Sequence, residues 1–141
     1  MAVIKSSRRG KEVSASASQI VTEFLQAFMS GDIDKASKMV REDLSFRAPL
    51  HEGCGNKAAY FAGAESKTRF VRAFRILRQW VDDDEVSTVC ELDMVTPEGA
   101  ATMAMSEWHT VEAGQLVSTF MVFNAFAEAA RLLGSALGAH H

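Results

Sequence analysis

The chain has 141 residues, of which 48% are hydrophobic, and it carries a formal net charge of −3. This length and apolar content fit one domain with a single core of ordinary size. No apolar run reaches the roughly 18 residues needed to span a bilayer, and residues 1–18 lack the apolar block of a secretory signal. We therefore expect a cytoplasmic protein that does not associate with membranes.

The charge is unevenly distributed along the chain. The first 17 residues sum to +3, which leaves −6 for the remainder. An acidic body argues against nucleic-acid binding. The small polar composition of the start predicts a disordered basic leader at 1–17, followed by one folded domain at 18–134 and a flexible tail at 135–141.

The cysteine content and the motifs exclude several kinds of site. Cys54 and Cys90 are too few for a disulfide framework, and neither belongs to a paired-cysteine metal motif. The sequence contains no metal-ligand spacing, phosphate loop or nucleophile elbow. It therefore predicts neither a metal nor another cofactor.

Two short helices that meet at a tight corner are predicted near the start of the domain. Apolar residues recur at helical spacing from Ile20 to Phe28, and Ser18 is a suitable N-cap. Gly31 can adopt the left-handed conformation that ends a helix, and Asp32 can cap the next one.

A strand, a loop and a third short helix are expected next. The strand covers Leu44–Pro49, and the helix begins at Lys57 with Asn56 as its cap. The following segment fits both a helical stripe and a strand. We interpret it as helix or loop up to Arg72 and as strand beyond, because the acidic turn 82–85 then joins two strands as a hairpin.

The rest of the sequence predicts a meander. Further strands are expected at Val86–Val95, Ala101–Val111 and Gln115–Phe123, with a last helix at Phe126–Leu133. This order predicts an α+β fold in which N-terminal helices pack over a curved antiparallel sheet and leave a cavity.

The element order and the Ser-Gly-Asp-Ile-Asp corner at 30–34 resemble the nuclear-transport-factor-two-like superfamily, particularly its SnoaL-like polyketide cyclases and ketosteroid isomerases. The resemblance covers about residues 18–125 and implies a cone-shaped barrel around a pocket. Ketosteroid isomerases use a tyrosine and two aspartates, whereas this chain has Phe24, Ala48 and Ser106 at the matching positions. Isomerisation by that mechanism is therefore disfavoured.

The resemblance also implies which residues of one strand face the pocket. It places Val89, Glu91 and Asp93 on the concave face, where the two carboxylates would repel, raise one pKa and form an acid–base pair. The opposite, convex face would then join two copies into a homodimer through Leu92, Met94, Met103 and Met105. The alternative is that the acids face water and the apolar set faces the core.

Other candidate site residues follow from the same comparison. His51, at the expected pocket mouth, can relay a proton, or it is an exposed loop residue. Tyr60 can offer a hydroxyl to a ligand, or it only packs. Alternation from Ser106 turns His109 and Glu107 outward. The predicted pocket wall consists of Phe24, Phe28, Phe46, Val89, Ser106, Trp108, Thr119, Met121 and Phe123.

Four arginines recur every third residue, at 69, 72, 75 and 78. They form a solvated basic edge, or one of them lies between the carboxylates, which is similar to the arrangement in limonene-epoxide-hydrolase-like enzymes. The leading hypothesis is a homodimer that takes a small apolar steroid-, polyketide- or terpenoid-like molecule. If it is an enzyme, it is a cofactor-free isomerase, cyclase, lyase or hydrolase. The alternative is a noncatalytic ligand-binding or dimerisation module.

Overall fold

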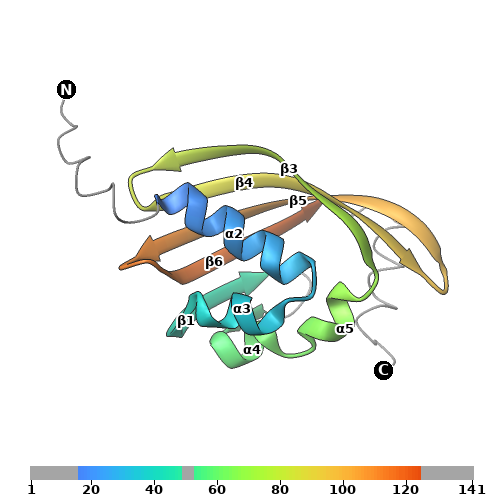
Figure 1. The fold of residues 1–141 in the computed structure, drawn as a ribbon, viewed down its shortest axis with the longest axis horizontal. Helices are drawn as coiled ribbons and strands as arrows, with labels where there is room; N and C mark the ends of the chain where they lie inside the picture. The colour runs from blue at the N-terminus through green and yellow to red at the C-terminus, as the bar shows by residue number, and fades with distance from the viewer. Residues whose placement is uncertain (1–15, 49–52, 125–141) are drawn as a thin grey trace.

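The computed structural model describes residues 16–48 and 53–124, in which four helices precede or interrupt a long sheet (Figure 1). The helices are α2 (Ala17–Met29), α3 (Ile33–Lys38), α4 (Lys57–Phe61) and α5 (Ala64–Thr68). The strands are β1 (Val40–Ala48), β2 (Gly53–Gly55), β3 (Val71–Asp82), β4 (Glu85–Thr96), β5 (Gly99–Glu112) and β6 (Gln115–Asn124). The basic leader, His51, the helix expected at 126–133 and the tail lie outside the described residues.

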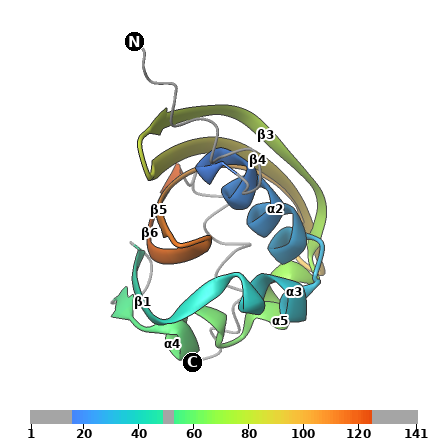
Figure 2. The ribbon, with the colours of Figure 1, turned by 60° about the vertical axis from the view of Figure 1, so that its left-hand side comes forward.

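The six strands form one mixed sheet in the order β2-β1-β6-β5-β4-β3. The predicted meander from β3 to β6 is confirmed, with antiparallel pairing at every step. β1 instead pairs with β6 in parallel, and β2 is a strand where a loop was expected. The parallel pair is possible because the chain crosses from β1 through α4 and α5 to the far edge before the meander returns to it. Figure 2 shows the sheet curling around α2.

Local capping chemistry fixes the helical corner. Ser16 and Gln19 form a capping box, in which Gln19 N donates to Ser16 Oγ at 3.2 Å and Ser16 N donates to Gln19 Oε1 at 2.9 Å. α2 therefore begins before the expected cap. Gly31 has a φ of +89°, and the Asp32 carboxylate accepts from Lys35 N, as predicted. None of the described helices is long and apolar enough to cross a membrane.

The core lies between α2 and one face of the sheet. Val21, Phe24 and Leu25 of α2 have no exposed surface. The sheet residues buried on this face alternate along β4 and β5: Val86, Thr88, Cys90, Leu92, Met94, Met103, Met105, Glu107, His109 and Val111. Because alternate side chains of a strand point to opposite faces, the intervening residues face away from the helices.

The prediction that these apolar residues of β4 and β5 form a dimer interface on a convex face is therefore wrong. Leu92, Met94, Met103 and Met105 form a buried cluster with Cys90, and each is at most 4% exposed. The helices cover the apolar face of this sheet, because burying the apolar set there removes the most hydrophobic surface from water. A dimer cannot use side chains that already fill the core.

We predict that Phe24→Ala lowers the free energy of unfolding by about 3–5 kcal/mol, because the ring is fully buried and the substitution leaves a cavity. The measurement is urea denaturation followed by circular dichroism. Glu23→Ala is the matched control, since Glu23 precedes Phe24 in the sequence but its side chain faces solvent. This substitution should change the free energy of unfolding by less than about 1 kcal/mol. Equal effects of the two variants would contradict the packing described here.

Candidate functional site

An acid and a histidine lie side by side inside the fold, on β5. Glu107 and His109 are two residues apart, so both point to the face covered by α2. His109 Nε2 lies 3.2 Å from Glu107 Oε1, and neither side chain has exposed surface. The contact lacks hydrogen-bond geometry, and among the described residues no partner satisfies the Glu107 oxygens or the His109 nitrogens.

A third polar side chain extends this group onto the neighbouring strand. Thr119 of β6 is the register partner of His109, is 3% exposed, and its hydroxyl likewise has no partner in the described part of the chain. Each such buried group costs about 1–3 kcal/mol when nothing pairs with it. Buried polar groups in folded proteins are normally satisfied by protein, water or ligand.

An aromatic wall surrounds the polar group. The Phe24 ring meets the His109 ring edge-on with centroids 5.8 Å apart. Tyr60, held by α4, packs against Phe46 at 5.0 Å, Phe28 at 5.4 Å and Phe24 at 6.2 Å. Three of the predicted wall residues, Phe24, Phe28 and Phe46, are thus buried, and so is Tyr60, the candidate hydroxyl donor.

Electrostatics keep two neighbouring side chains protonated. Burial raises the pKa of Tyr60 well above its ordinary value, and the Glu107 charge raises it further. Burial, with a smaller effect of Glu107, raises the pKa of Cys90 to about 12. Near neutral pH both groups are therefore hydrogen-bond donors rather than bases or nucleophiles, and the thiol donates to Met105 O at 3.7 Å.

Hydrogen bonds between polar side chains link α2 through β3 to β4, the strand that pairs with the strand of Glu107 and His109. Thr22 Oγ1 donates to Gln79 Oε1, and Gln79 Nε2 donates to Thr88 Oγ1, both at 3.2 Å. Thr88 is the register partner of Glu107. These bonds hold α2, β3 and β4 in the relative positions that enclose the pair.

The two carboxylates predicted to be catalytic lie on the outer face of the sheet, away from the helices. Arg75 of β3 binds both: Nη2 donates to Glu91 Oε1 at 3.1 Å, and Nη1 donates to Asp93 Oδ2 at 3.0 Å. Thr102 Oγ1 also donates to Asp93, at 2.8 Å. The prediction that Glu91 and Asp93 line the pocket is therefore wrong, and the alternative in which they face water is the one observed.

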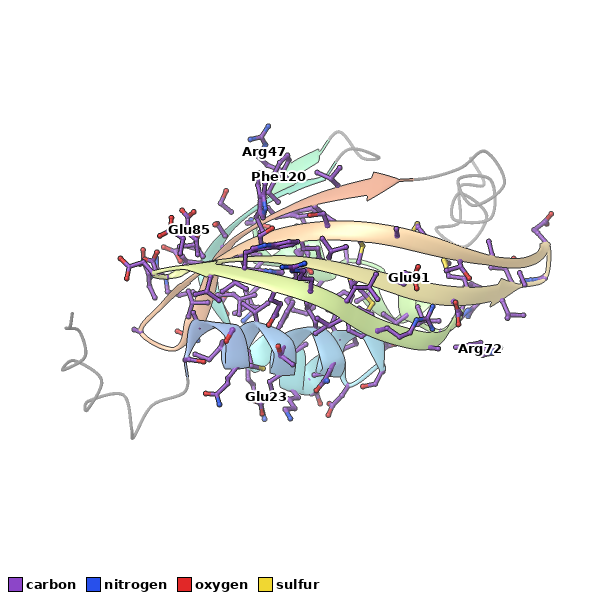
Figure 3. All side chains as sticks on the ribbon, turned by 90° about the horizontal axis from the view of Figure 1, so that it is seen from above. Glu23, Arg47, Arg72, Glu85, Glu91 and Phe120 are labelled. Carbon is purple, nitrogen blue, oxygen red and sulfur yellow. The ribbon has the colours of Figure 1, made fainter. Side chains whose placement is uncertain are left out.

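Three residues predicted to form the pocket wall also lie on the opposite face of the sheet from the one expected. Val89, Ser106 and Trp108 are on the outer face, where Trp108 is 54% exposed and its Nε1 donates to Ser87 Oγ at 2.6 Å. The outer face also carries Arg47 and Phe120, which Figure 3 shows pointing away from the side of α2 that bears Glu23.

The remaining candidate site residues either face the interior or lie outside the described residues. Thr119 and the partly buried Met121 face the interior. His51 and the side chain of Phe123 lie outside the described residues. Sequence reasoning missed Glu107 and His109, although they continue the alternation of Met103, Met105 and Val111, which was the available signal.

No arrangement suited to a metal is present within residues 16–48 and 53–124. In this part of the chain, no group of three or more His, Cys, Asp or Glu side chains is placed to hold an ion.

Helices over one face of a curled mixed sheet, with a polar group enclosed between them, define an α+β cone. No protein-family model and no curated protein sequence matches the chain. Its fold is shared with solved structures described as NTF2-like and SnoaL-like proteins, so the resemblance seen in the sequence is confirmed at the level of the fold.

Three solved structures illustrate the likeness. IdmH of Streptomyces antibioticus, described as a candidate polyketide cyclase, superposes with a TM-score of 0.69 at 17% identity over 88% of this chain and 99% of its own. An NTF2-like protein of unknown function from Cytophaga hutchinsonii gives 0.63 at 20% identity over 79% and 93%. A candidate SnoaL-like polyketide cyclase from Mesorhizobium loti gives 0.61 at 15% identity over 76% and 98%.

We predict that Asp93 titrates far below its ordinary value of 3.8, because its hydrogen bonds from Arg75, and secondly from Thr102, lower its pKa to about 2. Because the pKa of Asp93 is lowered in the folded state, its ionised carboxylate stabilises that state at pH values above the ordinary pKa of 3.8. This contribution is lost as the pH falls through about 2. Carbon NMR of the side-chain carboxyl should show this midpoint and its return towards 3.8 in Arg75→Gln. A wild-type midpoint at or above the ordinary value would contradict the outer-face ion pair.

Proposed function

We propose that this protein binds a small, mostly apolar molecule inside the cone and that Glu107 and His109 move a proton to or from it. The observation that carries the proposal is the set of buried polar atoms on Glu107, His109 and Thr119 that have no partner among the described residues. A ligand with an apolar body and one hydrogen-bonding group would match both these atoms and the aromatic wall.

The roles follow from the chemistry of each group. Glu107 accepts a proton from the ligand, and His109, 3.2 Å away, shares it and returns it at another position. Tyr60 stays neutral and can donate to an oxygen that gains negative charge. Proton transfer of this kind serves a cofactor-free isomerase, cyclase or lyase.

The ligand class is supported by the neighbours rather than by the site alone. Two of the similar structures are described as candidate polyketide cyclases. We therefore propose a polyketide-, steroid- or terpenoid-like ligand with an enolisable carbonyl or a hydroxyl. The epoxide-hydrolase-like alternative loses its basis, because Arg75 and both of its carboxylates lie on the outer face.

We predict that the wild-type protein accelerates the exchange of α-hydrogens of β-tetralone, a small apolar ketone, for deuterium in D₂O, followed by proton NMR. Glu107→Gln should reduce the acceleration about 10²–10⁴-fold, the range for loss of a general acid–base group. Glu91→Gln is the matched control, since its carboxylate lies on the other face of the sheet and should leave the rate unchanged.

A second readout separates catalysis from binding alone. β-Naphthol carries the hydrogen-bonding group that the interior needs, whereas naphthalene lacks it. A noncatalytic binding module would bind β-naphthol more tightly than naphthalene through Glu107 yet show no exchange of β-tetralone. Loss of exchange in Glu91→Gln, with Glu107→Gln unaffected, would overturn the assignment of the interior pair.

We also propose that the outer face of the sheet joins two copies of the chain. Trp108 and Val122 are 54% and 44% exposed there, and the Phe120 ring lies 5.4 Å from that of Trp108. Exposed apolar side chains gathered on one sheet face are typical of a partner surface.

We predict that Trp108→Glu halves the mass measured by light scattering, because it places a charge in the proposed contact. Glu23→Gln, on the solvent side of α2, should leave the mass unchanged. A wild-type protein that is monomeric even at about millimolar concentration would refute the interface.

A further inference from the structure

A cavity lies at the end of α2 that is away from its N-cap, between the end of α2, α5 and the beginning of β3. Its volume is about 630 Å³, within the usual range for small-molecule sites. Figure 1 shows α5 leading into the beginning of β3 on the same side of the molecule as the end of α2. The cavity lining includes Met29, Glu65, Arg69, Val71, Arg72 and Phe74.

The lining has an apolar part and a charged part. Met29, Val71 and Phe74 supply the apolar part, and all three also pack against the buried cluster around Cys90. Arg69 and Arg72 supply two positive charges, against one carboxylate from Glu65. The cleft therefore joins an apolar floor to a net positive rim.

Both guanidinium groups are positioned without being neutralised. Arg69 lies over the Phe70 ring at 4.9 Å, and Arg72 Nη1 donates to Arg69 O at 3.2 Å. No ion pair joins either group to a carboxylate in the part of the chain that the structure describes. Arg75, three residues further along β3, shows the contrast, since two carboxylates hold it. In Figure 3 Arg72 lies at the end of the sheet where β3 begins.

We propose that this cleft binds a small amphiphilic anion, with its carboxylate or sulfonate at Arg69 and Arg72 and its apolar body on Met29, Val71 and Phe74. A guanidinium group presents parallel N–H donors that match the two oxygens of such an anion. A neutral apolar ligand would leave both arginines unpaired. The site uses neither Glu107 nor His109, so it stands apart from the proposed proton-transfer function.

The test compares two probes that differ only in the charged group. Anilinonaphthalene sulfonate is an amphiphilic anion, and N-phenylnaphthylamine has the same rings without the sulfonate. Fluorescence titration of the full chain should show that Arg69→Gln with Arg72→Gln weakens sulfonate binding about tenfold or more, the expected effect of losing charge-assisted hydrogen bonds. Binding of the neutral probe should stay unchanged.

Two single variants sharpen the test. Glu65→Gln removes the one carboxylate of the lining and should tighten sulfonate binding. Arg78→Gln, which removes an exposed arginine that stacks on Trp80 elsewhere on β3, should have no effect. Opposite signs for Glu65→Gln and the double variant would support a local anion site.

The proposal fails if the double variant binds the sulfonate as the wild type does, if both probes weaken equally, or if Arg78→Gln has the same effect. It also fails if Glu107→Gln rather than the arginine variant removes sulfonate binding, because the probe would then occupy the interior. None of these results bears on the exchange of β-tetralone, so the two proposals can fail separately.

Discussion

The packing of α2 against the sheet determines the direction of every side chain in the strands beneath it. Phe24 meets the His109 ring, and Thr22 reaches Thr88 through Gln79, so one face of β4 and β5 is fixed against the helix. Because side chains alternate along a strand, this contact turns the acids of β4 outward and encloses Glu107. The positions of the interior pair and of the outer ion pair thus follow from one packing interaction.

Enclosing the pair is costly unless something binds there. A buried carboxylate needs a charged partner or hydrogen bonds, and His109, 3.2 Å from Glu107, makes no hydrogen bond to it. Apolar residues of similar volume would pack at the same positions at no such cost. Under the proposed function, a ligand that pairs with Glu107 and His109 would recover part of this cost.

The sequence was informative where chemistry is local. Gly31, Asp32 and Asn56 were recognised as helix boundaries, and the three hairpin turns set the meander, because caps and turns depend on a few adjacent residues. The parallel pairing of β1 with β6 depends on distant contacts and was missed. The faces were reversed because alternation shows that two faces differ but does not show which one a helix covers. Assignment by resemblance then shifted Trp108 inward and His109 outward.

The most direct test of the account is an experimental electron-density map of the purified protein around Glu107, His109 and Thr119. We predict ordered water or a co-purified small molecule within hydrogen-bond distance of the Glu107 carboxylate, with the His109 ring and the Thr119 hydroxyl directed at the same guest. A map in which these side chains are fully hydrogen-bonded to protein groups, with no guest and no space for one, would contradict it.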